Sequence, residues 1–540
     1  MNKQSRLIVF MPILMAVATI FGIFIGKNLP SSSGGTKKNN LFYTNSGSQN
    51  DKLNQIISLI EQEYVDTVNT DHLTDEAIAA LLEQLDPHSA YIPPVDLQGV
   101  NEDMEGNFDG IGVEFNIVND TIVVVAAISG GPSEALGIRS GDRIVKIDGT
   151  NVAGIKIKNE DVIKKLRGKK GTKVKVEVAR RNSKELVPYT ITRDKIPLYS
   201  LDASYMVNDE TGYIKLNRFA ENTYDEYMDA FKKLKKSGMK KMILDLRGNP
   251  GGYLNIAIAI ADEFLKSKEM IVYTQGRSRE KEDFKATTEG EFEDQPLVIL
   301  IDEGSASASE IIAGSMQDND RATIIGRRSF GKGLVQEQFE FKDGSAIRLT
   351  VARYYTASGR CIQRSYAEGT EKYYEDIYSE ILNKDPNHKA NPGDTLHKFK
   401  TKGGRIVYGG GGITPDIYVP MDTSGYSKYY SDVISKGVSY DFCFDYSDRN
   451  RGMLTTKFKD YRDFAKDMGL ADKILGEFVD FAGKHGITRN EAEIRRSRLW
   501  LINRLQSLVA RNIWKNEGFY YIINKDDTHI HAALKHLNRQ

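Results

Sequence analysis

The feature that most constrains the fold is an alternation of apolar runs and amphipathic segments in the middle of the chain. Gly212 to Leu216, Met239 to Leu246 and Leu297 to Ile301 are short apolar runs, typical of buried strands. Tyr224 to Lys236 and Leu254 to Leu265, which lie between them, have the apolar spacing of helices. Strands that alternate with helices predict crossover connections and a largely parallel sheet. Since 540 residues are too many for one core, we expect two to four domains.

The segment before this alternation has a different texture. Residues 108–193 hold short β-rich runs separated by Gly, Asn and Asp turns, with one helical piece from Glu160 to Leu166. This stretch is large enough to fold alone as a small domain. Its expected strands are Ile111 to Ile117, Thr121 to Ala127, Arg143 to Ile147, Lys173 to Ala179 and Val187 to Thr192.

Helices are expected toward both ends of the chain. From Lys52 to Leu85 apolar residues recur at helical spacing, and two short helices fit before Asp86-Pro87. From about Tyr429 onward the chain is predicted to be mainly helical, with Glu491 to Trp514 the clearest run. Residues 368–412 are polar and rich in Tyr and Gly, which favours an extended insertion.

The N-terminus predicts export from the cytoplasm. After Lys3 and Arg6, an uncharged and mostly apolar stretch runs from Leu7 to Ile25, within the length range that spans a bilayer as a helix. The positive flank favours a cytoplasmic end, with the rest of the chain outside. We expect a membrane anchor over residues 1–28 and a flexible linker over residues 29–50, with a cleaved signal peptide as the alternative.

The overall charge gives no reason to expect a nucleic-acid partner. Lys plus Arg and Asp plus Glu both number 74, so the formal net charge is zero. The two cysteines, Cys361 and Cys443, form no metal-spaced pair, and their spacing does not decide whether they bond to each other.

Three serines follow the expected strand Leu297 to Ile301, in the run Gly304-Ser305-Ala306-Ser307-Ala308-Ser309-Glu310. A serine at a strand-to-helix turn can present its hydroxyl beside backbone N–H groups that stabilise an oxyanion. No histidine occurs between His88 and His388, so a Ser-His pair would need distant segments, and Lys332 is the nearer candidate base. The alternative is that the serines only cap the helix that follows.

Lys332 could serve as a base only in its neutral form. A lysine has an ordinary pKa of about 10.4, and burial away from carboxylates lowers that pKa. Phe330, Leu334 and Val335 permit such burial, and the nearest acid is Glu337. The alternative is a solvated surface lysine.

A glycine-rich turn, Leu244-Asp245-Leu246-Arg247-Gly248-Asn249-Pro250-Gly251-Gly252, lies between another expected strand and helix. Such a turn can aim free N–H groups into a cleft. The alternative is an ordinary β-α loop, and the turn lacks the Gly-Lys-Ser/Thr ending of a phosphate-binding loop.

Together these motifs resemble the carboxyl-terminal processing proteases, a family of tail-specific Ser-Lys peptidases with an embedded PDZ domain. The serine run resembles the nucleophile motif of the family, and Phe330-Gly331-Lys332-Gly333 with Gln336 resembles its base motif. Three more motifs follow the family's order, namely Leu85-Asp86-Pro87-His88-Ser89, Leu244 to Gly252, and Gly412-Ile413-Thr414-Pro415-Asp416. The resemblance runs from about residue 50 to residue 420.

The resemblance implies roles for individual residues. The middle serine, Ser307, is expected to be the nucleophile, Lys332 the general base, and Gln336 the group that orients Lys332. The N–H groups of Gly252 and Ala308 are expected to form the oxyanion hole. The two outer serines are expected to pack or cap.

The β-rich segment is then expected to be the PDZ domain. Gly110-Ile111-Gly112-Val113 resembles its carboxylate-binding loop, where N–H groups hold a C-terminal carboxylate while the peptide adds as a strand. Gly137 to Asp142 resembles the PDZ signature that follows. Near the end of the chain, His529, His531 and His536 lack spaced acidic or Cys partners, so we expect a solvated tail there and not a metal site.

The expected fold is mixed α/β, with a ClpP/crotonase-like protease core, an inserted β-rich PDZ domain, and helical N- and C-terminal extensions. Residues 51–107 are expected to be the helical N-terminal part of the protease and residues 108–195 the PDZ domain. Residues 196–420 are expected to be the Ser-Lys core and residues 421–540 a C-terminal helical domain.

We expect a serine endopeptidase of the bacterial inner membrane, single-pass, with its catalytic part in the periplasm. It would bind exported proteins by their C-terminal tails and cleave them without a metal or another cofactor. Self-association is possible, and no nucleic-acid partner is expected. The alternative is a non-catalytic PDZ scaffold that only binds protein C-termini.

Overall fold

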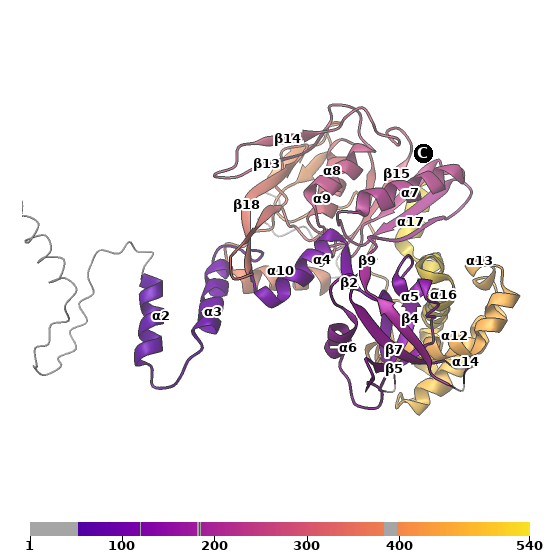
Figure 1. Cartoon of the computed structure of the whole chain (residues 1–540). Coiled ribbons are helices and arrows are strands. Elements are labelled where there is room, and N and C mark those ends of the chain that lie inside the picture. The colour runs from indigo at the N-terminus through magenta and orange to yellow at the C-terminus, as the bar shows by residue number, and fades with distance from the viewer. Residues whose placement is uncertain (1–51, 119, 181–182, 184, 383–396, 540) are drawn as a thin grey trace, which may run out of the picture. The chain divides into compact units, whose positions relative to one another are not determined.

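The computed structural model describes residues 52–118, 120–180, 183, 185–382 and 397–539 (Figure 1). The chain divides into two compact units, Met1–Thr74 and Asp75–Gln540. The two helices predicted between Lys52 and Leu85 are confirmed as α2 (Lys52–Glu63) and α3 (Thr70–Glu83). The predicted anchor, Leu7 to Ile25, lies outside the described residues. Among those that are described, no helix is long and apolar enough to cross a membrane.

A six-stranded sheet organises the second unit, in the order β10-β11-β12-β15-β16-β21. All neighbours from β11 to β21 are parallel, and only the edge strand β10 is antiparallel, so the largely parallel sheet is confirmed. The strands are β10 (Leu201–Met206), β11 (Thr211–Leu216), β12 (Lys241–Asp245), β15 (Leu297–Ile301), β16 (Thr323–Gly326) and β21 (Ile417–Tyr418).

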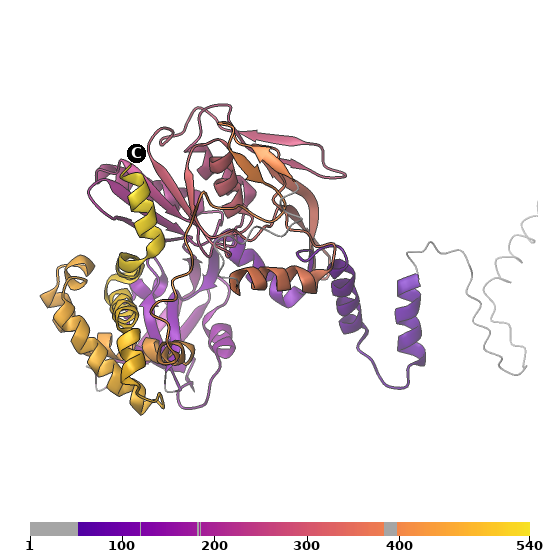
Figure 2. The same cartoon turned by 180° about the vertical axis from the view of Figure 1, so that it is seen from behind.

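Both faces of this sheet are covered, which explains its continuous apolar strands. On one face, Ile299 and Ile301 pack in a core with helices α7 (Thr223–Lys236), α8 (Leu254–Asp262) and α9 (Ala308–Asp318). On the other face, Val298 and Leu300 pack with α17 (Thr528–Leu537), the yellow helix at the C-terminus in Figure 2.

The position of α17 corrects the expectation of a solvated histidine tail. His529 is only 6% exposed and lies beside Asp527, while His536 Nε2 is 2.8 Å from the Thr323 hydroxyl. Apolar side chains of the same helix, such as Ile530, pack on the sheet, so the helix carrying the histidines is part of the core.

A second, antiparallel sheet also contributes to this core and was not predicted. Its path is β1-β18-β13-β14, with β17 also paired to β18. Helix α9 contacts strands of both sheets, and α8 packs beside α9 and contacts β13, so the two helices share the core between the layers. The strands are β1 (Ala90–Ile92), β13 (Met270–Gln275), β14 (Glu282–Lys285), β17 (Leu334–Glu340) and β18 (Ala346–Thr356).

The β-rich module, residues 108–195, forms a sheet in the order β3-β4-β5-β7-β8, with β6 beside β5. Four of its predicted strands match the structure, and the first begins at Val113 instead of Ile111. β2 pairs with β9 where the chain enters and leaves the module. Its elements are β2 (Asn107–Gly110), β3 (Val113–Val118), β4 (Thr121–Ala127), α5 (Pro132–Ala135), β5 (Arg143–Ile147), β6 (Thr150–Asn151), α6 (Asn159–Leu166), β7 (Lys173–Ala179), β8 (Val187–Thr192) and β9 (Asp194–Pro197).

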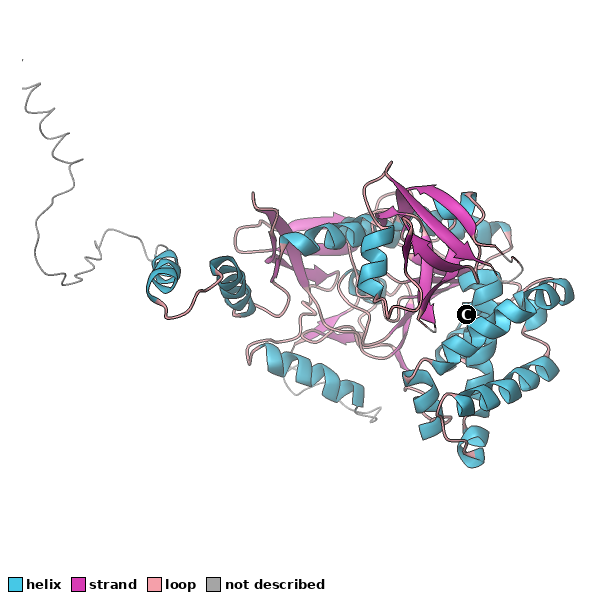
Figure 3. Cartoon of the chain, turned by 60° about the horizontal axis from the view of Figure 1, so that its bottom comes forward, coloured by secondary structure: helices cyan, strands magenta, loops and turns pink. Residues whose placement is uncertain are grey.

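The helical C-terminal region is confirmed and has a hydrophobic core of its own. Its helices gather in one cluster in Figure 3. The run Glu491 to Trp514 is divided at Ser497, and the second helix is distorted at Trp514 and Lys515. The elements are α11 (Lys428–Ser435), α12 (Val438–Lys457), α13 (Tyr461–Phe464), α14 (Met468–Lys484), α15 (Glu491–Arg496), α16 (Arg498–Ile523) and the 3₁₀ turn η3 (Asn524–Asp526).

The expected extended insertion, residues 368–412, is only partly extended. It begins with a helix, α10 (Thr370–Leu382), which buries Tyr373 and Ile377 on one side. After residues outside the described part, it ends in a hairpin, β19 (Lys398–Lys400) and β20 (Ile406–Tyr408). Helix α4 (Pro94–Glu105), which precedes the β-rich module, lies within residues 51–107, the part expected to be helical. Cys361 and Cys443 are both free thiols.

Candidate active site

Two loops leave the parallel sheet side by side and form the centre of the candidate site. The glycine turn follows β12 and the serine run follows its neighbour β15, and parallel strands end at the same edge of a sheet. The outer serines join the loops: Ser305 Oγ donates to the Leu246 carbonyl at 2.8 Å, and Ser309 Oγ donates to the Asn249 carbonyl at 3.0 Å. The Ala306 N–H also donates to Asn249 at 3.0 Å. Both outer hydroxyls are therefore committed to structural hydrogen bonds.

Ser307 differs from its neighbours in exposure and in backbone conformation. Ser305 and Ser309 are 0% exposed, whereas Ser307 is half-buried. Its φ of 54° and ψ of −113° place a non-glycine residue in a conformation that costs energy. The sharp turn immediately before α9 leaves its side chain accessible. The middle hydroxyl is thus the one that a substrate can reach.

Backbone N–H groups of Gly252 and Ala308 lie at the junction of the two loops. Ala308 is the first residue of α9, where an N–H has no partner within the helix. A Cβ on Gly251 would lie 2.8 Å from Ser307 Cβ and 2.9 Å from Ala308 N, so only glycine permits this approach. In the described part of the chain, neither the Gly252 nor the Ala308 N–H donates to a protein acceptor. These donors suit a developing oxyanion.

Lys332 lies in the loop that leads into β17, and its amine is hydrogen-bonded to Gln336. Lys332 Nζ donates to Gln336 Oε1 at 2.9 Å, and Gln336 Nε2 donates to the His88 carbonyl at 2.6 Å. Burial lowers the pKa of Lys332 below its ordinary value, and the positive charge of Arg348 lowers the pKa further. Both influences favour the neutral amine that a base requires.

Glu310 and Tyr354 hold the backbones of Ser307 and Lys332 together, and sequence reasoning gave neither a role. One oxygen of the buried Glu310 carboxylate, Oε2, accepts the N–H groups of both Ser307 and Lys332, each at 2.9 Å. The Tyr354 hydroxyl lies 2.5 Å from the Lys332 carbonyl and 3.2 Å from the Ser307 carbonyl. The two backbones therefore share one partner at their N–H groups and another at their carbonyls.

The Glu310 carboxylate is unusual in its burial. Burial raises the pKa of Glu310 to about 7, although hydrogen bonds from Ser329, Gly331, Lys332 and Ser307 oppose this rise. The ionised carboxylate can accept all four hydrogen bonds, whereas in the protonated form one oxygen carries a proton and is itself a donor. The spacing Ser307-x-x-Glu310 is a helix-capping pattern that was available in the sequence. Tyr354 had no such local signal, because it comes from β18.

The structure does not join the two predicted catalytic side chains directly. Ser307 and Lys332 both lie in the described part of the chain, yet no hydrogen bond links the Ser307 hydroxyl to the Lys332 amine. Catalytic hydrogen bonds are often long in the absence of substrate and form only in the complex. The Lys332 amine donates to Gln336 Oε1 instead.

His88 approaches the base from a distant part of the sequence. Its ring Nε2 lies 3.0 Å from the Tyr373 hydroxyl, and its ring centroid lies 6.1 Å from that of Phe330. Burial lowers the pKa of His88 to about 4, with a smaller contribution from the charge of Lys332, so the ring is neutral at pH 7. The fold therefore brings a histidine close to Lys332, but the ring of this histidine is hydrogen-bonded to the Tyr373 hydroxyl.

Three of the four residues predicted to bind a C-terminal tail line a groove in the β-rich module. Ile111, Gly112 and Val113 line a cavity of about 340 Å³, together with Ile163 and other residues of α6. Gly110 ends β2 and does not line the cavity. Strand β3 stands at the end of its sheet, so its outer edge is open to another strand in the described structure.

The described residues contain no group of three or more His, Cys, Asp or Glu side chains placed to hold a metal ion.

Comparison with known families matches four parts of the chain. Residues 210–373 match peptidase family S41, and residues 123–180 match the PDZ domain. Residues 18–94 match the N-terminal domain of the activating protease CtpB. Residues 429–515, most of the C-terminal helical region, match a family of unknown function.

Known proteins are similar over most of their length. The carboxy-terminal processing protease CtpA of Bacillus subtilis is 34% identical over 396 residues, which are 73% of this chain and 83% of that protein. A probable CtpA-like serine protease of Staphylococcus aureus is 35% identical over 65% of this chain and 70% of its own length. The solved photosystem II D1 C-terminal processing protease is 25% identical and covers 70% of this chain and 95% of its own, with a TM-score of 0.36, too low to support an argument.

Proposed function

The chain belongs to the carboxy-terminal processing proteases of peptidase family S41 and contains a PDZ domain, and on this basis we propose that it cleaves exported proteins with a Ser307-Lys332 dyad after binding their C-terminal tails. The observation that carries the proposal is the shared anchoring of the two residues. Glu310 Oε2 accepts both N–H groups at 2.9 Å, beside an accessible serine at a strained turn.

In the proposed reaction, Ser307 Oγ attacks the carbonyl carbon of the scissile bond while the neutral Lys332 amine accepts the hydroxyl proton. The oxyanion that forms is stabilised by the N–H groups of Gly252 and Ala308. The lysine then donates its proton to the leaving amine, which completes the acyl-enzyme. Neutral again, Lys332 activates a water molecule that hydrolyses the ester. Gln336 orients the lysine between these steps.

The proposal extends to the location of the enzyme and to its architecture. The positive flank and apolar stretch before Lys27 support a single-pass anchor in the bacterial inner membrane, with the catalytic part in the periplasm. The parallel sheet with α7, α8 and α9 supports a ClpP/crotonase-like core over residues 196–420. The further boundaries, 51–107, 108–195 and 421–540, remain part of the proposal.

A non-catalytic PDZ scaffold is the second candidate. A scaffold requires only the tail-binding groove. It leaves the strained backbone of Ser307 and the lowered pKa of Lys332 without a function. Comparison of envelope-protein C-termini by mass spectrometry, in cells with the wild-type chain and with Ser307→Ala, separates the two. The protease predicts shortened C-termini that depend on Ser307. Identical C-termini in both cells would favour the scaffold.

The pH dependence of kcat/KM should follow the ionisation of Lys332. Only the neutral amine accepts a proton, so activity should rise with pH as the lysine deprotonates. The charge of Arg348 lowers the pKa of Lys332, and its removal in Arg348→Gln should let that pKa rise. The rising limb of the profile should therefore move to higher pH, with the largest loss near neutral pH. Hydrolysis of a fluorogenic peptide from pH 5 to 10 measures this shift.

Arg353→Gln is the matched control for the Arg348 variant. Arg353 lies on the same strand, but its charge is not among the influences on Lys332, and its guanidinium is 3.3 Å from the Tyr366 hydroxyl. Its profile should keep the wild-type position. If the rising part of the pH profile stayed in place in Arg348→Gln, or shifted equally in both variants, the observed ionisation would belong to a group other than Lys332.

Substitution in the PDZ groove should separate tail binding from chemistry. Ile163 lines the groove and is 40% exposed, so Ile163→Asp removes apolar contact area without emptying a core. Burial of an apolar side chain contributes about 1.5–3 kcal/mol to binding. Its loss predicts a rise in KM of about tenfold or more for tail-bearing clients. Hydrolysis of a small ester substrate should be unchanged.

The control for this experiment is Ile155→Asp, in the same domain. Ile155 is 53% exposed and lies outside the groove, so neither substrate should be affected. Equal losses on the ester and on the tail-bearing client in Ile163→Asp would instead indicate that the domain acts on the active site itself.

A further inference from the structure

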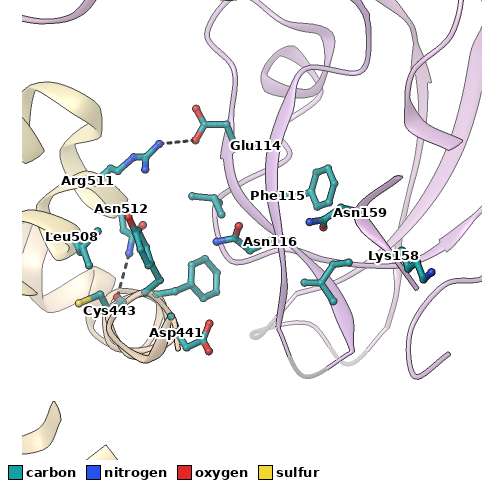
Figure 4. A pocket seen from close by; sticks show the side chains of 15 residues that line it. Glu114, Phe115, Asn116, Lys158, Asn159, Asp441, Cys443, Leu508, Arg511 and Asn512 are labelled. Atoms are coloured by element: carbon teal, nitrogen blue, oxygen red, sulfur yellow. Dashed lines mark hydrogen bonds and ion pairs between the residues drawn. The ribbon is translucent and has the colours of Figure 1, made fainter. Parts of the chain in front are cut away.

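A cavity separates the PDZ domain from the C-terminal helices, and nothing described above gives it a role. Its volume is about 630 Å³. One wall comes from β3, β4 and the start of α6, and the other wall comes from α12 and α16 (Figure 4). The second wall lies in the region that matches a family of unknown function.

Specific contacts hold the helical wall against the PDZ domain. Arg511 of α16 is paired with Glu114 of β3 at 3.3 Å, as Figure 4 shows. Arg451 of α12 donates to the Ser140 hydroxyl at 2.9 Å. The Gly141 backbone also approaches Asp448 so closely that a Cβ would clash with its carboxylate. Of these contacts, the Arg511–Glu114 pair lines the cavity itself.

The cavity continues the tail-binding groove. Both are lined by Glu114 and Phe115, and both follow β3 and α6. The groove contains the start of β3 and the end of α6, at Val113 and Leu166, whereas the cavity contains Ile117 and Asn159 from the opposite ends of the same elements. The two spaces thus adjoin each other along β3, and the cavity also reaches Val125 of the neighbouring strand β4.

The direction of a bound tail determines which of its residues reach the cavity. A peptide added to β3 with its carboxylate at residues 111–113 runs antiparallel to the strand, with a rise of about 3.3 Å per residue. Its last three or four residues fill the groove as far as Phe115. Residues from about the fourth to the seventh from the C-terminus then pass Ile117 and enter the cavity.

We propose that the C-terminal helical region forms an upstream extension of the tail-binding site, in which an extended client segment lies between β3 and the helices α12 and α16. This inference rests on the proposed binding of C-terminal tails by the PDZ domain. The occupant is the segment about four to seven residues before the client's C-terminal carboxylate. Amide groups of the exposed Asn116 and Asn159 are available there to its backbone, and Ile117 and Tyr440 to its apolar side chains.

Arg511 is the group on the helical wall that is best suited to the client. Its ion pair with Glu114 is 38% and 48% exposed, so the pair contributes little to stability. A client carbonyl or carboxylate can therefore replace Glu114 as the partner of the Arg511 guanidinium with little loss of free energy. Lys158 adds a second exposed cation on the opposite wall.

Peptide binding to the full-length Ser307→Ala chain tests the proposal. Two fluorescent peptides share one client C-terminal sequence, one of four residues and one of ten, and a ten-residue peptide with a C-terminal amide controls for carboxylate capture. We expect the ten-residue acid to bind about tenfold more tightly than the four-residue acid. In Arg511→Ala this gain should be largely lost, while the affinity of the four-residue peptide should be unchanged.

Two further variants test whether the effect is specific to the cavity. Asn116→Ala removes an exposed amide from the PDZ wall of the cavity and should also weaken only the longer peptide. Arg498→Ala, on the same helix as Arg511 but paired with Asp472 away from the cavity, should weaken neither. Equal affinity of the short and long acids, or equal weakening of both by Arg511→Ala, would overturn the extension. Failure of both acids to bind would overturn the proposed tail capture itself.

Discussion

Ser307→Ala is expected to lower kcat for peptide hydrolysis by a factor on the order of 10⁵ or more, because no other group replaces the nucleophile. The fold should remain intact. The Ser307 N–H still donates to Glu310, and the side chain itself is half-buried at the surface of the loop. Turnover of a fluorogenic peptide, measured together with Tm, distinguishes loss of chemistry from loss of folding.

Ser309→Ala is the matched control, two residues away in the same run. Its hydroxyl donates to the Asn249 carbonyl, which keeps a second donor in the Ala306 N–H. The change should remove about 1 kcal/mol of stability, lower Tm by a few degrees and leave kcat within about tenfold. If Ser309→Ala abolished turnover and Ser307→Ala did not, the assignment of the middle serine would be wrong.

Lys332→Arg should be nearly as inactive as Lys332→Ala, with kcat/KM reduced by about 10³-fold or more. Arginine keeps the positive charge and the length of the side chain, but it does not deprotonate in the working pH range. Charge alone therefore cannot rescue the reaction. Steady-state kinetics of both variants on the same peptide make the comparison.

Lys241→Arg provides the control for a lysine-to-arginine change at another partly buried position. Lys241 Nζ donates to the Leu537 carbonyl at 2.8 Å, far along the chain from the dyad, and arginine can make the same kind of bond. Its activity should stay close to that of the wild type. Substantial turnover by Lys332→Arg would exclude Lys332 as the proton acceptor.

The elements predicted from the sequence are those with a strong local signal. β15 is five apolar residues in succession, all buried, and was predicted with the correct bounds. β12 was predicted too long, from Met239, because that apolar residue packs against Leu234 at the end of α7 instead of continuing the strand. Periodicity detects burial, and burial alone does not define a strand.

The antiparallel sheet was missed because its strands carry no such pattern. β18 has intermediate burial over most of its length, with Thr350, Arg353 and Tyr355 among its residues, so neither alternation nor a continuous apolar run marks it. α10 was missed for a related reason, since its buried side is narrow and most of its residues are polar.

The candidate site also has parts that the sequence predicts and parts that only the structure reveals. The serine run, the glycine turn and the lysine were visible as motifs, but three equivalent serines could not be ranked by chemistry in the sequence. The structure distinguishes them by burial and by the φ of 54° at Ser307. Tyr354 contacts Lys332 and Ser307 across 22 and 47 residues of sequence, and the Gln336 bond to His88 spans 248 residues. Contacts between residues so far apart arise only from the tertiary fold.

The central claim is that Lys332 activates Ser307, and labelling with a fluorophosphonate, a probe that reacts with activated serines, tests it most directly. The modified peptide is identified by mass spectrometry at pH values from 6 to 9. We predict one labelled residue, Ser307, with a rate that rises with pH in the wild type and no labelling in Ser307→Ala or Lys332→Arg. Labelling at another serine, undiminished labelling in Lys332→Arg, or no labelling at any pH would contradict the account.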